Sequence, residues 1–114
     1  MLRFRLETLS VLRSSDTGVR RAVVWVAAGE FDDTGRHLGP RLLVVLGDSI
    51  HADELRHAVG VRLTRLPHVL GVLPPEVARQ VESFVTTNRD TLLRHWRGEI
   101  DTRETLDLLE KVPP

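Results

Sequence analysis

Two histidines and a glutamate within one short segment are the residues best suited to chemistry in this sequence. His51, Glu54 and His57 follow one another at intervals of three residues. On a helix, this spacing places the three side chains partly on one face, where they can share a cation. Two imidazoles and a carboxylate can form a mononuclear transition-metal site, so these three residues are the candidate metal ligands. The alternative interpretation is a polar helix face at the surface.

Acid–base catalysis is the second chemical possibility, because the chain contains five histidines. Together with an arginine and a glutamate, histidines could serve a small hydrolase or nuclease. The sequence has no Gly-x-Ser-x-Gly elbow, no phosphate-binding loop and no dinucleotide-binding fingerprint. We therefore predict no catalytic residue and no cofactor. A small histidine- or metal-dependent hydrolase or nuclease is kept as an alternative function.

The charge balance bears on nucleic-acid binding. Sixteen basic residues are matched by sixteen acidic ones, and the isoelectric point is near 7.0. Proteins that bind nucleic acid through its phosphates usually carry a basic excess or a basic stripe. Arg20 and Arg21, at the start of an expected strand, are the candidate phosphate contacts. A nucleic-acid-binding module is therefore a second alternative and not the leading prediction.

The N-terminal half of the chain has the pattern of an antiparallel sheet. Residues 2–12 begin with alternating apolar and charged side chains, which predicts a half-buried strand. Residues 20–31 are rich in β-branched side chains, and residues 41–48 are apolar on both faces, so each predicts a further strand. Residues 60–66 alternate again and could form a fourth strand. Short polar turns favour a mainly antiparallel sheet of three to four strands over about residues 2–66.

The C-terminal half has the periodicity of two helices. Apolar residues recur at helical spacing from residue 77 to residue 96, interrupted by Asn88, and Gly98 follows as a stop. Asp101 and Glu104 then have the spacing of a capping box, which begins a second helix. The predicted helices span about residues 75–97 and 101–112. We expect a single α+β domain over residues 1–114, with both helices packed on one face of the sheet.

The stretch from Asn88 to Leu109 resembles a known group of proteins. Its pattern is Asn88, Leu92-Leu93, Trp96-x-Gly98-Glu99-Ile100-Asp101-Thr102-x-Glu104 and Leu106. This pattern is similar to the tail of small uncharacterised bacterial proteins that are associated with toxin–antitoxin modules. Those families often carry a Pro-Pro-His-x-His element, which this sequence lacks; Leu66-Pro-His-Val69 is its nearest counterpart here. The resemblance therefore implies a bacterial interaction partner and carries over no shared chemistry.

Apolar residues exceed what two helices on one face of a sheet can bury. Residues 22–28 and 42–46 could be buried on both faces, and the connector after residue 68 is apolar as well. In a small chain, leftover apolar surface is commonly buried in a homodimer or a heterologous complex. The predicted partner-binding residues are Trp25, Val69, Leu70, Val72 and Leu73.

These observations predict a small non-enzymatic protein-interaction module. It would act as a dimer or as the partner of another bacterial protein. The resemblance implies that this role is of the toxin–antitoxin type. No apolar run reaches the length of a membrane-spanning helix, and the N-terminus lacks the apolar stretch of a signal peptide. We therefore expect a cytoplasmic protein with no membrane partner. The absence of cysteine excludes disulfides and is compatible with that location.

Overall fold

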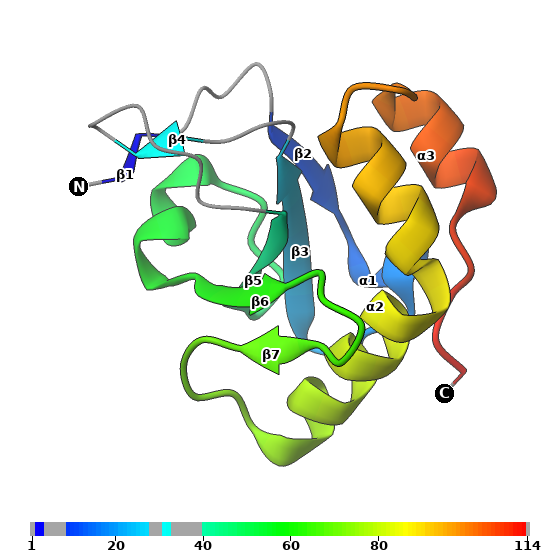
Figure 1. Ribbon diagram of the computed structural model, residues 1–114. Coiled ribbons are helices and arrows are strands. Elements are labelled where there is room, and N and C mark those ends of the chain that lie inside the picture. The colour runs from blue at the N-terminus through cyan, green and yellow to red at the C-terminus, as the bar shows by residue number, and fades with distance from the viewer. Residues whose placement is uncertain (1, 4–8, 28–30, 33–39, 114) are drawn as a thin grey trace.

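The computed structural model describes residues 2–3, 9–27, 31–32 and 40–113 (Figure 1). It confirms the α+β class, because the sheet comes from the N-terminal half and the long helices come from the C-terminal half. The elements in chain order are β1 (Leu2–Arg3), β2 (Leu9–Leu12), α1 (Ser14–Thr17), β3 (Ala22–Ala27), β4 (Phe31–Asp32), β5 (Arg41–Leu46), the 3₁₀ helix η2 (Ala52–His57), β6 (Val59–Arg62), β7 (His68–Val69), α2 (Pro75–Trp96) and α3 (Thr102–Leu108).

The main sheet is an antiparallel meander in the order β2-β3-β5-β6-β7. β5 lies in the middle, as expected for a strand that is apolar on both faces. The sheet has one strand more than predicted, because β7 is a two-residue strand in a segment that the sequence marks as an irregular connector. The single strand predicted for residues 2–12 contains two strands: β1 pairs with β4 in a separate ribbon, and β2 pairs with β3. Residues 4–8 lie outside the described residues.

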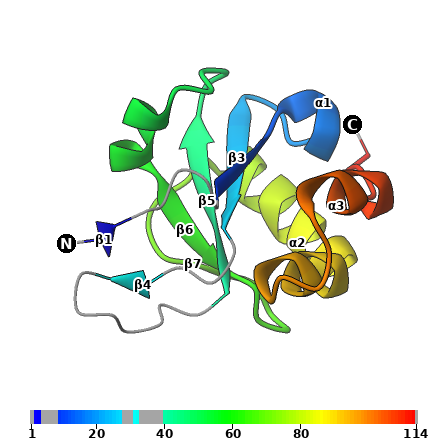
Figure 2. The same ribbon diagram turned by 90° about the horizontal axis from the view of Figure 1, so that it is seen from above.

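The main core lies between one face of the sheet and α2. Val24 and Val44, which pair across β3 and β5, are fully buried together with Val81 and Phe84 of α2. Successive side chains of a strand point to opposite faces, so alternate residues of each strand build this core. Figure 2 shows α2 and α3 on the same side of the sheet. The predicted placement of both helices on one face is confirmed.

The opposite face of the sheet carries a second, smaller apolar cluster. Its buried members are Val23, Trp25, Leu43 and Val45. The segment around η2 covers them through Ile50, Ala52, Leu55 and Ala58, and η2 lies across the sheet from α2 in Figure 2. The apolar surface expected to be left over on β3 and β5 is therefore buried within the chain. The prediction failed to foresee this because η2 has no strong apolar stripe of its own.

The reversal between α2 and α3 is held on both sides by helix capping. Gly98 has a φ of +76°, and it ends α2 as predicted. The N–H groups of Gly98 and Glu99 donate to the carbonyl oxygens of His95 and Arg94 at 3.0 and 2.9 Å, which is a Schellman motif. Asp101 then begins α3. Its carboxylate accepts from the Glu104 N–H at 2.8 Å, while the Glu104 carboxylate accepts from the Asp101 N–H at 3.2 Å. The predicted capping box is confirmed.

Asn88, the polar residue inside the apolar stripe of α2, holds the chain that follows α3. Its Oδ1 accepts from the Glu110 N–H at 2.8 Å, and its Nδ2 donates to the Glu110 carbonyl at 2.8 Å. Nδ2 also donates to the carbonyl of Phe84 at 3.0 Å. Because Asn88 takes the Glu110 N–H, that group cannot continue the ladder of α3. This explains why α3 ends at Leu108 and not near residue 112, as the sequence predicts.

Residues 109–113, which we call the C-terminal segment, reach as far as α1. The N–H of Val112 donates to the carbonyl oxygen of Thr17 at 2.8 Å. Leu109 and Val112 pack against the main core. Thr17 is fully buried, and its hydroxyl accepts from the Val19 N–H at 3.0 Å. The C-terminal segment therefore closes the fold by joining α2 to the first helical turn of the chain.

Candidate functional site

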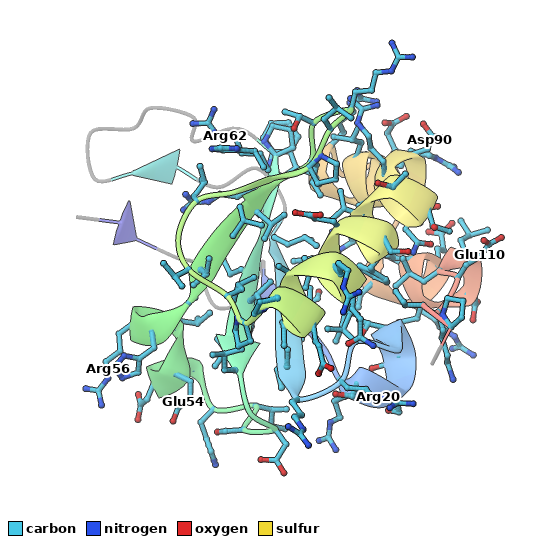
Figure 3. All side chains as sticks on the ribbon, turned by 90° about the horizontal axis from the view of Figure 1, so that it is seen from below. Arg20, Glu54, Arg56, Arg62, Asp90 and Glu110 are labelled. Carbon is cyan, nitrogen blue, oxygen red and sulfur yellow. The ribbon has the colours of Figure 1, made fainter. Side chains whose placement is uncertain are left out.

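The predicted metal ligands lie on and beside η2. His51 is the N-cap of η2, and both His51 and His57 are exposed. Nε2 of His57 accepts a hydrogen bond from Nε of Arg56 at 3.1 Å. Figure 3 shows Glu54 and Arg56 at the outer edge of the molecule, directed into solvent. Within the described ranges, no three His, Asp or Glu side chains gather as a metal site, and these three residues therefore give no support to a bound cation.

The predicted partner-binding residues divide into buried and exposed ones. Trp25 is buried in the cluster under η2, and Leu73 is buried in the main core. Neither side chain is available to a partner, because other residues of the same chain already cover it. Val69 is half-buried at the sheet edge, whereas Leu70 is 41% exposed and Val72 is 90% exposed. The sequence prediction missed Leu66, which is 84% exposed in the turn between β6 and β7.

The predicted phosphate contacts line a cavity of about 340 Å³. This cavity lies where the start of β3 meets the first turns of α2 and the C-terminal segment. Its lining residues are Arg20, Arg21, Glu76, Val77, Arg79, Gln80 and Pro113. Arg79 could not be found from the sequence, since nothing there shows that α2 begins beside residue 20. The folded chain thus adds a third guanidinium to the two that the sequence pattern suggested.

Backbone contacts fix the arginine-lined cavity. The N–H of Arg20 donates to Oε1 of Gln80 at 2.8 Å, which ties the turn before β3 to α2. Arg21 has a φ of +59°, a left-handed backbone conformation that residues other than glycine rarely adopt. Its carbonyl oxygen accepts from the N–H of Gly47 at 2.8 Å, and this bond anchors the turn. The two neighbouring arginines are therefore held by main-chain contacts while their side chains border the cavity.

A buried histidine lies on the other end of α2. His95 is 5% exposed, and its Nε2 lies 3.5 Å from the hydroxyl of Thr102, which is in turn 2.6 Å from the hydroxyl of Ser10. This row of side chains joins β2, α2 and α3. Nδ1 of His95 is buried and has no hydrogen-bond partner among the described residues. Burial lowers the pKa of His95 below its ordinary value, while the carboxylate of Asp101 acts in the opposite direction.

The lowered pKa of His95 predicts a loss of stability in mild acid. In the unfolded chain this imidazole takes up a proton near its ordinary pKa of 6.5, whereas the folded protein resists protonation. The free energy of unfolding should therefore decrease as the pH falls below 6.5 and level off below the folded pKa. Urea unfolding at a series of pH values measures this slope. His95→Gln should flatten it and the exposed-site variant His51→Gln should not; an unchanged slope in His95→Gln would contradict the assignment.

Comparison of the chain with protein-family models, curated proteins and solved structures found no match. Among the described residues, no helix is both long and apolar enough to span a membrane.

Proposed function

We propose that the chain is a small protein-interaction module and that its contact surface is the edge of the sheet at β7. Three apolar side chains flank this edge: Leu66 precedes β7, and Leu70 and Val72 follow it. Their exposure is the observation that supports the proposal, because burying such side chains is a main driving force for association. We call these three residues the hairpin surface.

The hairpin surface lies at a free edge of the sheet. β7 pairs with β6 on one side only, and no described strand pairs with its other side. β7 has two residues, which is too short to template the addition of a long strand from a partner. A partner would therefore contact this edge through side chains and not through backbone hydrogen bonds to β7. The opposite edge strand, β2, is bridged to α3 by the Ser10–Thr102 hydrogen bond, so β7 is the more accessible edge.

The partner in this proposal is a second copy of the chain or another protein with an apolar surface. A metal-dependent hydrolase or nuclease receives less support, because among the described residues no three His, Asp or Glu side chains gather as a metal site. The toxin–antitoxin-type role implied by the sequence resemblance is compatible with an interaction module, and it remains part of the proposal.

The hairpin surface predicts an effect on association. Leu66→Ser with Val72→Ser removes two exposed apolar side chains, each contributing about 1.5–3 kcal/mol when buried. Self-association, or binding of a copurified partner, should weaken by roughly a hundredfold or more. Light scattering over a wide concentration range, with mass spectrometry of the intact peak, measures it.

A matched control comes from α3, where Leu106 and Leu108 are 40% and 49% exposed on a different part of the molecule. Leu106→Ser with Leu108→Ser should leave association unchanged. A wild-type chain that is monomeric at every concentration and copurifies with no protein would overturn the proposal. Equal weakening by both double variants would place the contact elsewhere.

A further inference from the structure

We propose that the arginine-lined cavity binds a small phosphate monoester, whose phosphate is held among Arg20, Arg21 and Arg79. The three arginines come from the turn before β3 and from α2, and they line one cavity of about 340 Å³. Guanidinium groups bind phosphate through paired hydrogen bonds with matching planar geometry. This inference is independent of the interaction surface at β7.

The charges of the cavity favour an anion. Three arginines and one glutamate, Glu76, line the cavity, which leaves two positive charges in excess. Among the described residues, no carboxylate forms an ion pair with Arg20, Arg21 or Arg79. Elsewhere the chain does use such pairing, as between Arg97 and Glu99 at 3.7 Å. A bound phosphate would provide the counter-charge that the fold does not supply.

The first turn of α2 adds backbone donors to the same cavity. Glu76 and Val77 line it, and their N–H groups belong to the first turn, which has no carbonyl partners within the helix. Pro74 is the N-cap and gives no side-chain hydrogen bond to this turn. The positive end of the 22-residue helix α2 therefore borders the cavity that the three arginines line. The arginines and the N-terminus of α2 would therefore both attract an anion.

The rest of the lining restricts the ligand to a phosphate monoester that carries hydroxyl groups. The volume of about 340 Å³ lies at the lower end of small-molecule sites. The Glu76 carboxylate would repel a second phosphate group, but it can accept a hydrogen bond from a hydroxyl of the ligand. Gln80 uses Oε1 for the Arg20 N–H and keeps its amide N–H groups as donors. A sugar phosphate or a nucleoside monophosphate has this combination of groups.

The same phosphate chemistry could come from a nucleic-acid backbone. We favour the free monoester because the three arginines line one pocket and do not form a stripe, and because the chain as a whole is neutral. Backbone binding of nucleic acid usually depends on several phosphate contacts spread over a basic surface. A single pocket is better matched to one phosphate.

The test is a titration of the full chain, followed by NMR or calorimetry, with ribose 5-phosphate, adenosine 5′-monophosphate, ribose and a short DNA duplex. The phosphate esters should bind, and ribose alone should not. Arg79→Gln should weaken binding of the esters by roughly tenfold or more, because a charge-assisted bond to phosphate is lost. Arg20→Gln should act in the same way, and its backbone bond to Gln80 is retained.

Arg94→Gln is the matched control. It removes the same charge from the same helix, 15 residues and thus about 22 Å further along the axis, where its exposed side chain is distant from the cavity. Its affinity for the esters should equal that of the wild type. Thermal unfolding of each variant shows that a loss of binding is not a loss of folding. Absence of ester binding, equal weakening by Arg94→Gln, or binding of the duplex alone would each overturn the proposal.

Discussion

Replacing Asn88 with alanine is expected to lower the free energy of unfolding by about 3 kcal/mol. Three hydrogen bonds are lost at once, two to the backbone of Glu110 and one to the carbonyl of Phe84. Asn88 is 2% exposed, so its site in α2 would be left as a partly apolar void against freed backbone groups. Urea unfolding measures the loss.

The effect should be local to the C-terminal segment before it becomes global. In Asn88→Ala, the amide of Glu110 should exchange with solvent much faster, since it loses its acceptor, and the amide of Val112 should follow because the segment that presents it to Thr17 is no longer anchored. Asn88→Asp keeps the shape but turns a donor into an acceptor against two carbonyl oxygens, so it should destabilise at least as strongly. Thr87→Ala, at an exposed position beside Asn88, is the control and should cost little. A change below about 0.5 kcal/mol in Asn88→Ala would contradict the role given to this side chain.

Gly18→Ala is the second substitution with a large expected effect, about 3 kcal/mol of unfolding free energy. Gly18 has a φ of +79°, a conformation that costs a residue with a Cβ about 1–2 kcal/mol. An added Cβ would also overlap the backbone oxygen of Val112 and lie 2.8 Å from its nitrogen. The C-terminal segment must then move, and the hydrogen bond from Val112 to Thr17 is strained or broken.

A second glycine separates these two contributions. Gly98 has nearly the same φ, +76°, but an added Cβ there meets nothing within 4 Å. Gly98→Ala should therefore show only the conformational cost, about 1–2 kcal/mol. The difference in thermal unfolding between the two variants measures the close approach of the C-terminal segment to α1. Equal losses in both variants would show that this contact contributes nothing to stability.

Local patterns were sufficient to predict the main strands and the two C-terminal helices of this fold, but not β7 or the division of residues 2–12 into two strands. The apolar spacing of α2, the Gly98 stop and the Asp101 capping box depend on residues close together in the chain, and all three are confirmed. The central position of β5 followed from its apolar residues on both faces. These features are determined by backbone and burial preferences that act within about one helical turn or one strand.

Contacts between distant segments were not predictable from those patterns. Asn88 looked like an interruption of an apolar stripe, because its partner Glu110 is 22 residues further along. Trp25 was predicted to contact a partner, because the sequence of η2 has no apolar periodicity to show that this segment packs over Trp25. Arg79 had no recognisable relation to Arg20 and Arg21 until α2 was placed beside them. The sequence thus indicated two of the three arginines that line the cavity, and the third became evident only from the packing of α2.

The contact between Val112 and Thr17 also limits when the protein can fold during synthesis. α1 is synthesised well before the C-terminal segment, but the carbonyl of Thr17 receives its partner only after Val112 has been added. The sheet and α2 can assemble earlier, since their partners are made in order along the chain. Completion of the native state must therefore wait for nearly the whole described chain to emerge, which exposes the early assembly to chaperones and proteases until the last contact forms.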